Sequence, residues 1–224
     1  MIYNFLEITL LSIIQGISEF LPVSSSAHLY LVSEIYQFRS QSLMTDVALH
    51  LGSLIAIIFF FRNELINIFE NKNLLYLLVL GSVPLIIVGL LIFSTGLINN
   101  LRNLEVVAWT TFIFAIILFV ADKFKVRKKL NTNLNIKSIL FIGLFQILSI
   151  IPGVSRSGIV ITAGRFLNFD RFDSTKISFY LSIPAIAGAS ILTLKDLTYE
   201  TINFNIVILF AIIFAFIVSY LSIK

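Results

Sequence analysis

Long apolar runs dominate the chain, and they differ in whether polar or helix-breaking residues interrupt them. Three nearly uninterrupted runs each approach the roughly 20 apolar residues that cross about 30 Å of hydrocarbon as a helix: residues 74–93, 104–121 and 204–223. Four others are shorter or broken by Pro, Gly, Ser or a charge: residues 4–21, 47–61, 136–151 and 176–194. This pattern predicts an all-α polytopic membrane protein with about six to eight membrane segments.

Two of the broken regions align with each other at an offset of 131 residues. The stretch QGISEFLPVSSSA from Gln15 then lies over QILSIIPGVSRSG from Gln146, with identities at five of thirteen positions. Irregular backbone at membrane depth is tolerated where it is buried in protein or lines a wet cavity. The pattern therefore predicts one membrane domain, residues 1–224, with two halves at about 1–93 and 136–224. An inverted internal repeat relates them, and each contributes a re-entrant or broken helix to a shared site.

Composition supports the membrane class and excludes other chemistry. Hydrophobic residues make up 58% of the chain and charged residues 12%, and the mean hydropathy is +0.99. Because there is no cysteine, disulfides, thiolate metal sites and cysteine nucleophiles are excluded. The N-terminal stretch lacks a basic n-region and a small-residue cleavage site, so it is predicted to be part of the fold rather than a signal peptide.

Positive charge is concentrated in one loop, residues 122–137. Its cations account for much of the net charge of +4: Lys123, Lys125, Arg127, Lys128, Lys129 and Lys137. By the positive-inside rule this loop is cytoplasmic. The basic balance therefore indicates membrane orientation, and nucleic acid is not expected as a partner.

The first broken region contains several polar side chains at membrane depth, where apolar residues such as leucine are usual. Gln15 and Glu19 are four residues apart and share a helix face, and an ionisable group at membrane depth costs about 2.5 to 3.5 kcal/mol. Pro22 ends that helix, and the serines at 24–26 offer hydroxyls and backbone N–H groups to an anion. His28 can exchange a proton near neutral pH.

The second broken region supplies a cation. The stretch PGVSRSG, residues 152–158, holds Arg156 as the only cation in roughly thirty residues, between Ser155 and Ser157. A buried guanidinium favours a bidentate oxyanion partner, and phosphate fits it. We expect the two regions to bring acid, alcohol, imidazole and guanidinium around one diphosphate headgroup, so that His28 and Arg156 share a cavity.

Simpler interpretations exist for each of these residues. Gln15 and Glu19 could form a contact between helices, the serines could only cap helices, and Arg156 could snorkel to the surface. A polyprenyl-phosphate or anion carrier would use the same broken helices, and a purely structural membrane protein would need neither motif. Glu7, Asp46 and His50 are given no chemistry and are treated as structural or rim residues.

The motifs resemble those of the BacA-type undecaprenyl-pyrophosphate phosphatases. The resemblance lies in four strings, QGISE, EFLPVSSSAHL, DVALHLGSLIAIIFFFRNEL and PGVSRSG, and covers residues 13–65 and about 143–165. It implies hydrolysis of undecaprenyl diphosphate to undecaprenyl phosphate and inorganic phosphate, which recycles the lipid carrier of peptidoglycan synthesis, and it links the family to bacitracin resistance. It also implies a divalent cation, Mg²⁺ or Ca²⁺, and a site in the bacterial plasma membrane that opens to the outer face. A homo-oligomer is left open.

The resemblance also assigns roles by position. It places the family's acidic motif on Gln15 and Glu19, with the metal on Glu19. It places the catalytic serine and histidine on Ser25 and His28, and the phosphate-binding arginine on Arg156. Substrate contacts are expected from Gln15, Ser24, Ser26, Ser155 and Ser157.

Three mechanisms stay open: Ser25 attacks after activation by His28, His28 attacks directly, or His28 activates water. The sequence departs from the family at Ala27, where glycine is usual, and at Val160, where threonine is usual. Family members typically continue past the helix that matches residues 204–223 into one further helix, and two expectations stay open here: that this last span is absent, or that a neighbour does its work.

Overall fold

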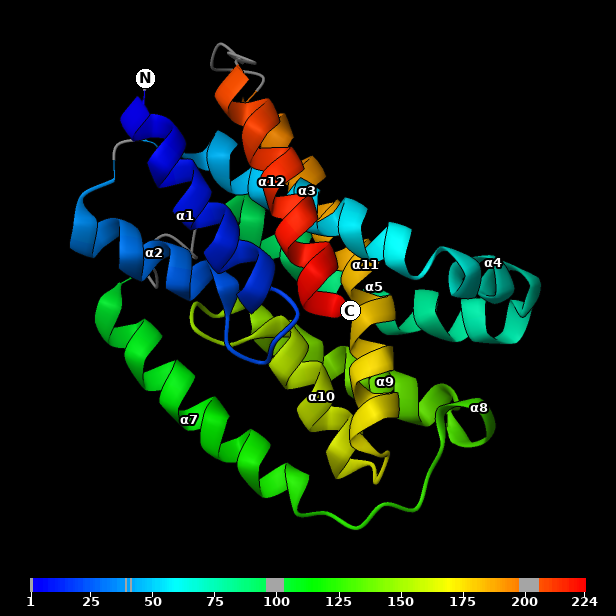
Figure 1. Ribbon diagram of the computed structural model, residues 1–224. Helices are drawn as coiled ribbons and strands as arrows, with labels where there is room; N and C mark the ends of the chain where they lie inside the picture. Colours follow the sequence, from blue (N-terminus) through cyan, green and yellow to red (C-terminus); the bar gives the residue numbers. More distant parts are fainter. Residues whose placement is uncertain (1, 39, 41, 96–102, 198–205) are drawn as a thin grey trace. The chain divides into compact units, whose positions relative to one another are not determined.

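The structure is a computed structural model that describes residues 2–38, 40, 42–95, 103–197 and 206–224 (Figure 1). Within these residues the backbone is helical, and the one strand-like pairing is an isolated bridge between Lys128 and Phe169. The elements are α1 (Ile2–Ser18), α2 (Ser25–Tyr36), α3 (Leu43–Phe60), α4 (Arg62–Glu70), α5 (Lys72–Thr95), α7 (Leu104–Asp122), α8 (Leu130–Asn133), α9 (Ile136–Ile147), the 3-10 turn η1 (Leu148–Ile150), α10 (Arg156–Phe166), α11 (Arg171–Leu197) and α12 (Ile206–Ile223).

Five helices of the described chain are long and apolar enough to cross a membrane. Helices α5, α7 and α12 carry the three uninterrupted runs, and α3 and α11 carry two of the interrupted ones. Shorter apolar helices at Asn4–Ser18 and Ile136–Ile150 account for the other two runs. The predicted all-helical, multi-pass membrane fold is confirmed, while residues 204 and 205 of the last predicted run lie outside the described residues.

One compact unit holds α1, α2, α3, α12 and the end of α11. It consists of Met1–Phe20, Ser25–Arg62 and Ile186–Lys224. Helix α12 packs against α3 and α1, and glycines let the backbones approach closely. A Cβ on Gly52 would lie 2.5 Å from the carbonyl oxygen of Ile212, and one on Gly16 would lie 2.8 Å from the backbone nitrogen of Ser219. Membrane helices associate in this way because lipid provides no hydrophobic drive between them, so close van der Waals packing must do so.

The second compact unit consists of Leu21–Ser24 and Asn63–Ala185. Helix α5 packs on α9, where a Cβ on Gly143 would lie only 2.4 Å from the carbonyl oxygen of Gly81. Helix α10 packs against α7 and α9. Gly153 approaches α7 closely and has a φ of +89°, which an L side chain rarely adopts.

Arg165 closes one end of the second unit. Its side chain is buried, and its guanidinium donates to Asp122 Oδ1 at 3.2 Å and to the carbonyl oxygens of Asp122 at 2.7 Å, Phe124 at 2.8 Å and Phe169 at 2.5 Å. These bonds join the end of α7 to the end of α10. A buried guanidinium whose donors are used in this way is a structural cross-link.

Both predicted breaks in the helices are present. Helix α1 ends at Ser18 and α2 begins at Ser25, while α9 and η1 end at Ile150 and α10 begins at Arg156. At the offset of 131 residues, Ser25 lies over Arg156, so both helices restart at aligned positions. This agreement is consistent with the internal repeat. The division into halves at about 1–93 and 136–224 stays a prediction.

Candidate active site

The predicted pair Gln15 and Glu19 forms at the end of α1. The helix continues as far as the backbone bond from Glu19 N–H to the Gln15 carbonyl, at 2.9 Å. The side-chain amide of Gln15 donates from Nε2 to Glu19 Oε2 at 3.0 Å. Both residues are buried, Gln15 completely and Glu19 to a relative exposure of 7%. The shared helix face predicted from their spacing is therefore confirmed.

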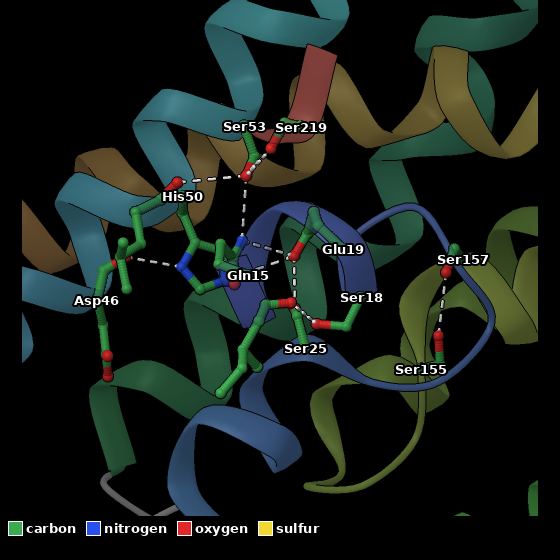
Figure 2. A network of polar contacts seen from close by, with 12 residues as sticks. Gln15, Ser18, Glu19, Ser25, Asp46, His50, Ser53, Ser155, Ser157 and Ser219 are labelled. Atoms are coloured by element: carbon green, nitrogen blue, oxygen red, sulfur yellow. Dashed lines mark hydrogen bonds and ion pairs between the residues drawn. The ribbon is translucent and has the colours of Figure 1, made fainter. Parts of the chain in front are cut away.

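Ser25 is the first residue of α2, and it faces this carboxylate. Its Oγ donates a hydrogen bond to Glu19 Oε2 at 2.5 Å (Figure 2). Hydrogen bonds from a hydroxyl to an ionised carboxylate are short and strong. A buried serine on a buried carboxylate pairs a nucleophile with a group that can take its proton.

Two serines that the sequence analysis did not single out form hydrogen bonds that hold the Gln15 side chain. Gln15 Nε2 lies 3.3 Å from Ser53 Oγ on α3, and Ser53 Oγ lies 2.9 Å from Ser219 Oγ on α12. All three side chains are fully buried. The contacts tie α1, α3 and α12 together at the site. The only sequence feature that could have indicated this role is a single serine in an apolar run. That feature is weak, because a serine hydroxyl in a helix often donates only to a backbone carbonyl of the same helix.

His50, to which the sequence analysis assigned no chemistry, also lies at the site. It lies on α3, one turn before Ser53, and its Nε2 is 3.7 Å from Glu19 Oε2. Its Nδ1 lies 2.7 Å from the backbone oxygen of Asp46. The sequence analysis treated His50 as a structural or rim residue, and the structure places it beside the Glu19 carboxylate. A histidine within an apolar membrane run was itself the signal.

The remaining residues of the first motif lie around the turn between α1 and α2. Ser24 is buried and has a φ of 53°, in the left-handed region that few non-glycine residues adopt. The side chains of Ser26 and His28 on α2 are exposed. The substrate contacts of Ser24 and Ser26, and the catalytic role of His28, stay predictions.

The second motif forms a capped helix start. Ser155 caps α10 by accepting a hydrogen bond from the Gly158 N–H at 3.1 Å, and its Oγ lies 3.0 Å from Ser157 Oγ (Figure 2). Arg156, half-buried, is the first residue of that helix. A guanidinium beside the N-terminal amides of a helix makes a seat for an anion, because the amides and the helix dipole both favour negative charge.

The turn of the first motif lies against the second motif. Ser157 Oγ donates to the backbone oxygen of Leu21 at 2.7 Å, and a Cβ on Gly158 would lie 3.4 Å from Pro22 Cβ. Segments 136 residues apart in the chain thus meet within the second unit. Glu19, Ser25 and His28 belong to the first unit and Arg156 to the second, so a cavity shared by His28 and Arg156 stays a prediction.

Threonines on α7 hold the break before α10. Thr110 Oγ1 donates to the Pro152 oxygen at 2.6 Å, and Thr111 Oγ1 donates to the Gly153 oxygen at 3.2 Å. These hydroxyls satisfy carbonyl groups that the broken helix leaves unpaired, as membrane burial requires. Nothing in the sequence around Thr110 pointed to this role.

The expected divalent cation can be tested against these donors. Among the described residues, no three His, Cys, Asp or Glu side chains converge. Glu19 offers a carboxylate, and Gln15 Oε1 is a buried oxygen with no hydrogen-bond partner in the described chain. Mg²⁺ commonly binds through one or two carboxylates together with substrate phosphates and water. The donor set therefore fits a cation whose coordination the substrate completes.

Comparison with known proteins agrees with this chemistry. A family model described as bacitracin resistance protein BacA matches residues 8–224. An undecaprenyl-diphosphatase of Pelagibacter ubique (strain HTCC1062) is 58% identical over 225 residues, which cover 100% of this chain and 88% of that protein. Those of Elusimicrobium minutum (strain Pei191) and Alteromonas mediterranea are 45% and 38% identical, over 87% and 97% of this chain and 78% and 86% of their own lengths. Since the model matches nearly the whole chain, the protein belongs to the BacA family.

Proposed function

We propose that this protein hydrolyses undecaprenyl diphosphate to undecaprenyl phosphate and inorganic phosphate, and so recycles the lipid carrier of peptidoglycan synthesis. Its relatives carry the name undecaprenyl-diphosphatase. The observation that carries the proposal is the 2.5 Å hydrogen bond from Ser25 Oγ to Glu19 Oε2. A carrier of the same lipid would need to bind phosphate, but it would not need a hydroxyl poised on a buried carboxylate.

Ser25 and Glu19 are assigned to phosphoryl transfer. Ser25 Oγ attacks the terminal phosphorus, its proton passes to Glu19, and the bond from that phosphorus to the bridging oxygen breaks. Undecaprenyl phosphate leaves, and a water molecule then cleaves the phosphoserine to release phosphate. The hydrogen bond from Ser25 to Glu19 supports serine attack, the first of the three mechanisms, but with Glu19 in place of His28 as the proton acceptor. His28 is left to activate the water.

Arg156 and the start of α10 are assigned to phosphate binding. Arg156 is the first residue of this helix and Ser155 caps it, so the helix N-terminus and a guanidinium are available to one anion, with Ser155 and Ser157 beside them. Phosphoryl transfer is accelerated mainly by positioning and charge stabilisation, so such a clamp contributes directly to the rate.

A divalent cation, Mg²⁺ or Ca²⁺, is proposed as the cofactor. When bound, it would spread the charge that develops on the phosphoryl oxygens. Glu19 would hold it, and the phosphate oxygens of the substrate would complete its coordination.

The protein is placed in the bacterial plasma membrane, with residues 122–137 in the cytoplasm and the site open to the outer face. The support is the concentration of Lys and Arg in that loop, which by the positive-inside rule stays cytoplasmic. The substrate, a polyprenyl diphosphate lipid, would reach the site from the membrane.

Phosphate release from a purified, detergent-solubilised sample tests the proposal. With a polyprenyl diphosphate and Mg²⁺ or Ca²⁺, the wild type should release inorganic phosphate, and Glu19→Gln and Arg156→Ala should lose at least about 100-fold in turnover. Glu34→Gln is the matched control, because Glu34 is an exposed carboxylate on α2 with no assigned role. Uptake of the lipid into vesicles without hydrolysis would instead establish a carrier.

A further inference from the structure

The ring of His50 is held in one orientation by its own helix. Its Nδ1 lies 2.7 Å from the backbone oxygen of Asp46, four residues earlier on α3. A carbonyl oxygen can only accept, so Nδ1 carries the hydrogen of this bond. In the neutral ring the lone pair is then on Nε2.

The Nε2 lone pair faces the Glu19 carboxylate. Nε2 of His50 lies 3.7 Å from Glu19 Oε2, and Figure 2 shows the ring directed toward the carboxylate from α3. The amide that donates from Gln15 Nε2 to Glu19 also carries Oε1, a buried acceptor with no hydrogen-bond partner among the described residues. Burial of this oxygen and of the Glu19 carboxylate is costly unless a donor or a positive charge joins them.

Metal-binding histidines show the same local arrangement. A ligating imidazole almost always donates its other ring N–H to a carboxylate, a water or a backbone carbonyl, which fixes the ring and raises the basicity of the ligating nitrogen. His50 makes that bond to Asp46, and its other nitrogen lies next to the carboxylate proposed to hold the cation.

We infer that His50 Nε2 is a second protein ligand of the divalent cation, beside the Glu19 carboxylate. The inference rests on the cation of the proposed function. The cation would draw His50 Nε2 and the Glu19 carboxylate together from their separation of 3.7 Å. Phosphate oxygens and water would supply its other ligands.

A nitrogen ligand changes which ion the site prefers. Imidazole nitrogen is a poor ligand for Ca²⁺, which prefers oxygen ligands, whereas Mn²⁺ is a first-row transition metal that mixed nitrogen and oxygen sites can bind. The site is therefore expected to bind Mn²⁺ more tightly than Ca²⁺. His50→Gln, which replaces the nitrogen ligand with an oxygen ligand, should reduce the difference between the two binding affinities.

Pulsed electron paramagnetic resonance on Mn²⁺ tests the inference directly. The full chain in lipid nanodiscs, loaded with Mn²⁺ alone, should show the hyperfine coupling of a directly bound nitrogen, and histidine labelled with the heavier nitrogen isotope should change that coupling. The chain has only two histidines, His28 and His50, so assignment is simple. His50→Gln should remove the coupling and weaken Mn²⁺ binding roughly tenfold or more, whereas His28→Gln should retain the coupling.

Each outcome decides the matter. Bound Mn²⁺ without nitrogen coupling in the wild type overturns the inference whatever the variants do, and so does coupling that disappears in His28→Gln but persists in His50→Gln. Phosphate release is measured on the same samples. Hydrolysis without nitrogen coupling rejects the His50 ligand and leaves the proposed function standing. Nitrogen coupling without hydrolysis rejects the proposed function and leaves the ligand.

Discussion

Glu19 Oε2 joins the end of α1 to the start of α2. It accepts hydrogen bonds from Gln15 Nε2 and from Ser25 Oγ, so one carboxylate oxygen orients both the supporting amide and the candidate nucleophile. Ser24, just before that nucleophile, has a left-handed backbone with a φ of 53°. Strained backbone of this kind is often found at functional sites, where surrounding contacts hold it in place.

Turnover is expected to depend on the hydroxyl of Ser25. Ser25→Ala should lower turnover by about 10³-fold or more, because it removes the attacking oxygen while Glu19 keeps its bond from Gln15. Ser222→Ala, which removes an exposed hydroxyl on α12 with no assigned role, should leave turnover nearly unchanged. Phosphate release under saturating lipid measures both variants. Equal losses would show that Ser25 is not the nucleophile.

Helix contacts in the first unit depend on glycine. Gly52→Ala should destabilise the protein by about 1 to 3 kcal/mol, since the new Cβ would lie 2.5 Å from the Ile212 oxygen and would force α3 and α12 apart. Gly89 in α5 is the control, because a Cβ there meets nothing within 4 Å. Gly89→Ala should be neutral or slightly stabilising. Thermal unfolding in detergent compares the two.

The two broken helices share a geometry but not a chemistry. Gln146 aligns with Gln15, yet the position that aligns with Glu19 is Ile150. Gln146 is fully buried, and neither its Nε2 nor its Oε1 has a hydrogen-bond partner in the described chain. The first break carries the acid, and the second carries Arg156.

Helices α4 and α11 are linked by a carboxylate outside the spans. Glu64 Oε2 lies 2.8 Å from Lys176 Nζ and also accepts a hydrogen bond from Tyr180. Partial burial raises the pKa of Glu64, but the hydrogen bonds from Lys176 and Tyr180 outweigh it, so the pKa lies below the ordinary value of 4.5. A lowered pKa contributes stability above the ordinary value, and that contribution disappears as the pH falls through the folded pKa.

The unfolding temperature of Glu64→Gln should therefore lie below that of the wild type near neutral pH. The difference should shrink as the pH falls below 4.5, because the wild-type carboxyl then becomes protonated too. Thermal unfolding of both proteins over this pH range measures the effect. A difference that stayed constant with pH would mean that Glu64 contributes nothing through its charge.

Orientation is a property of the whole molecule, and the absence of cysteine makes it simple to test. Asn131→Cys, in the basic loop, should react with a membrane-impermeant maleimide only when the reagent reaches the cytoplasmic face. Glu105→Cys lies at the opposite end of α7 and should react only from the outer face. Labelling of intact and inverted vesicles compares the two sites. The reverse pattern would invert the proposed topology.

Much of the fold was predictable because hydropathy and helix breaking are local properties. The three uninterrupted runs, both breaks and the pairing of Gln15 with Glu19 all follow from residues close in sequence, and the structure confirms them. The support from Ser53 and Ser219 could not be predicted. It depends on contacts across 38 and 166 residues of chain, and a serine in an apolar run has no distinctive local pattern.

The sequence by itself determined the class of the protein and the chemical types at its site, because apolar run length selects membrane helices and polar groups at membrane depth need a function or a partner. Only the tertiary structure decided which groups meet. It placed Ser25 on Glu19, brought His50 to the same carboxylate, and laid the turn at Leu21 against Ser157. The contacts of His50 and of Ser157 join segments far apart in the chain, and their distances depend on how the chain packs, which no local pattern records.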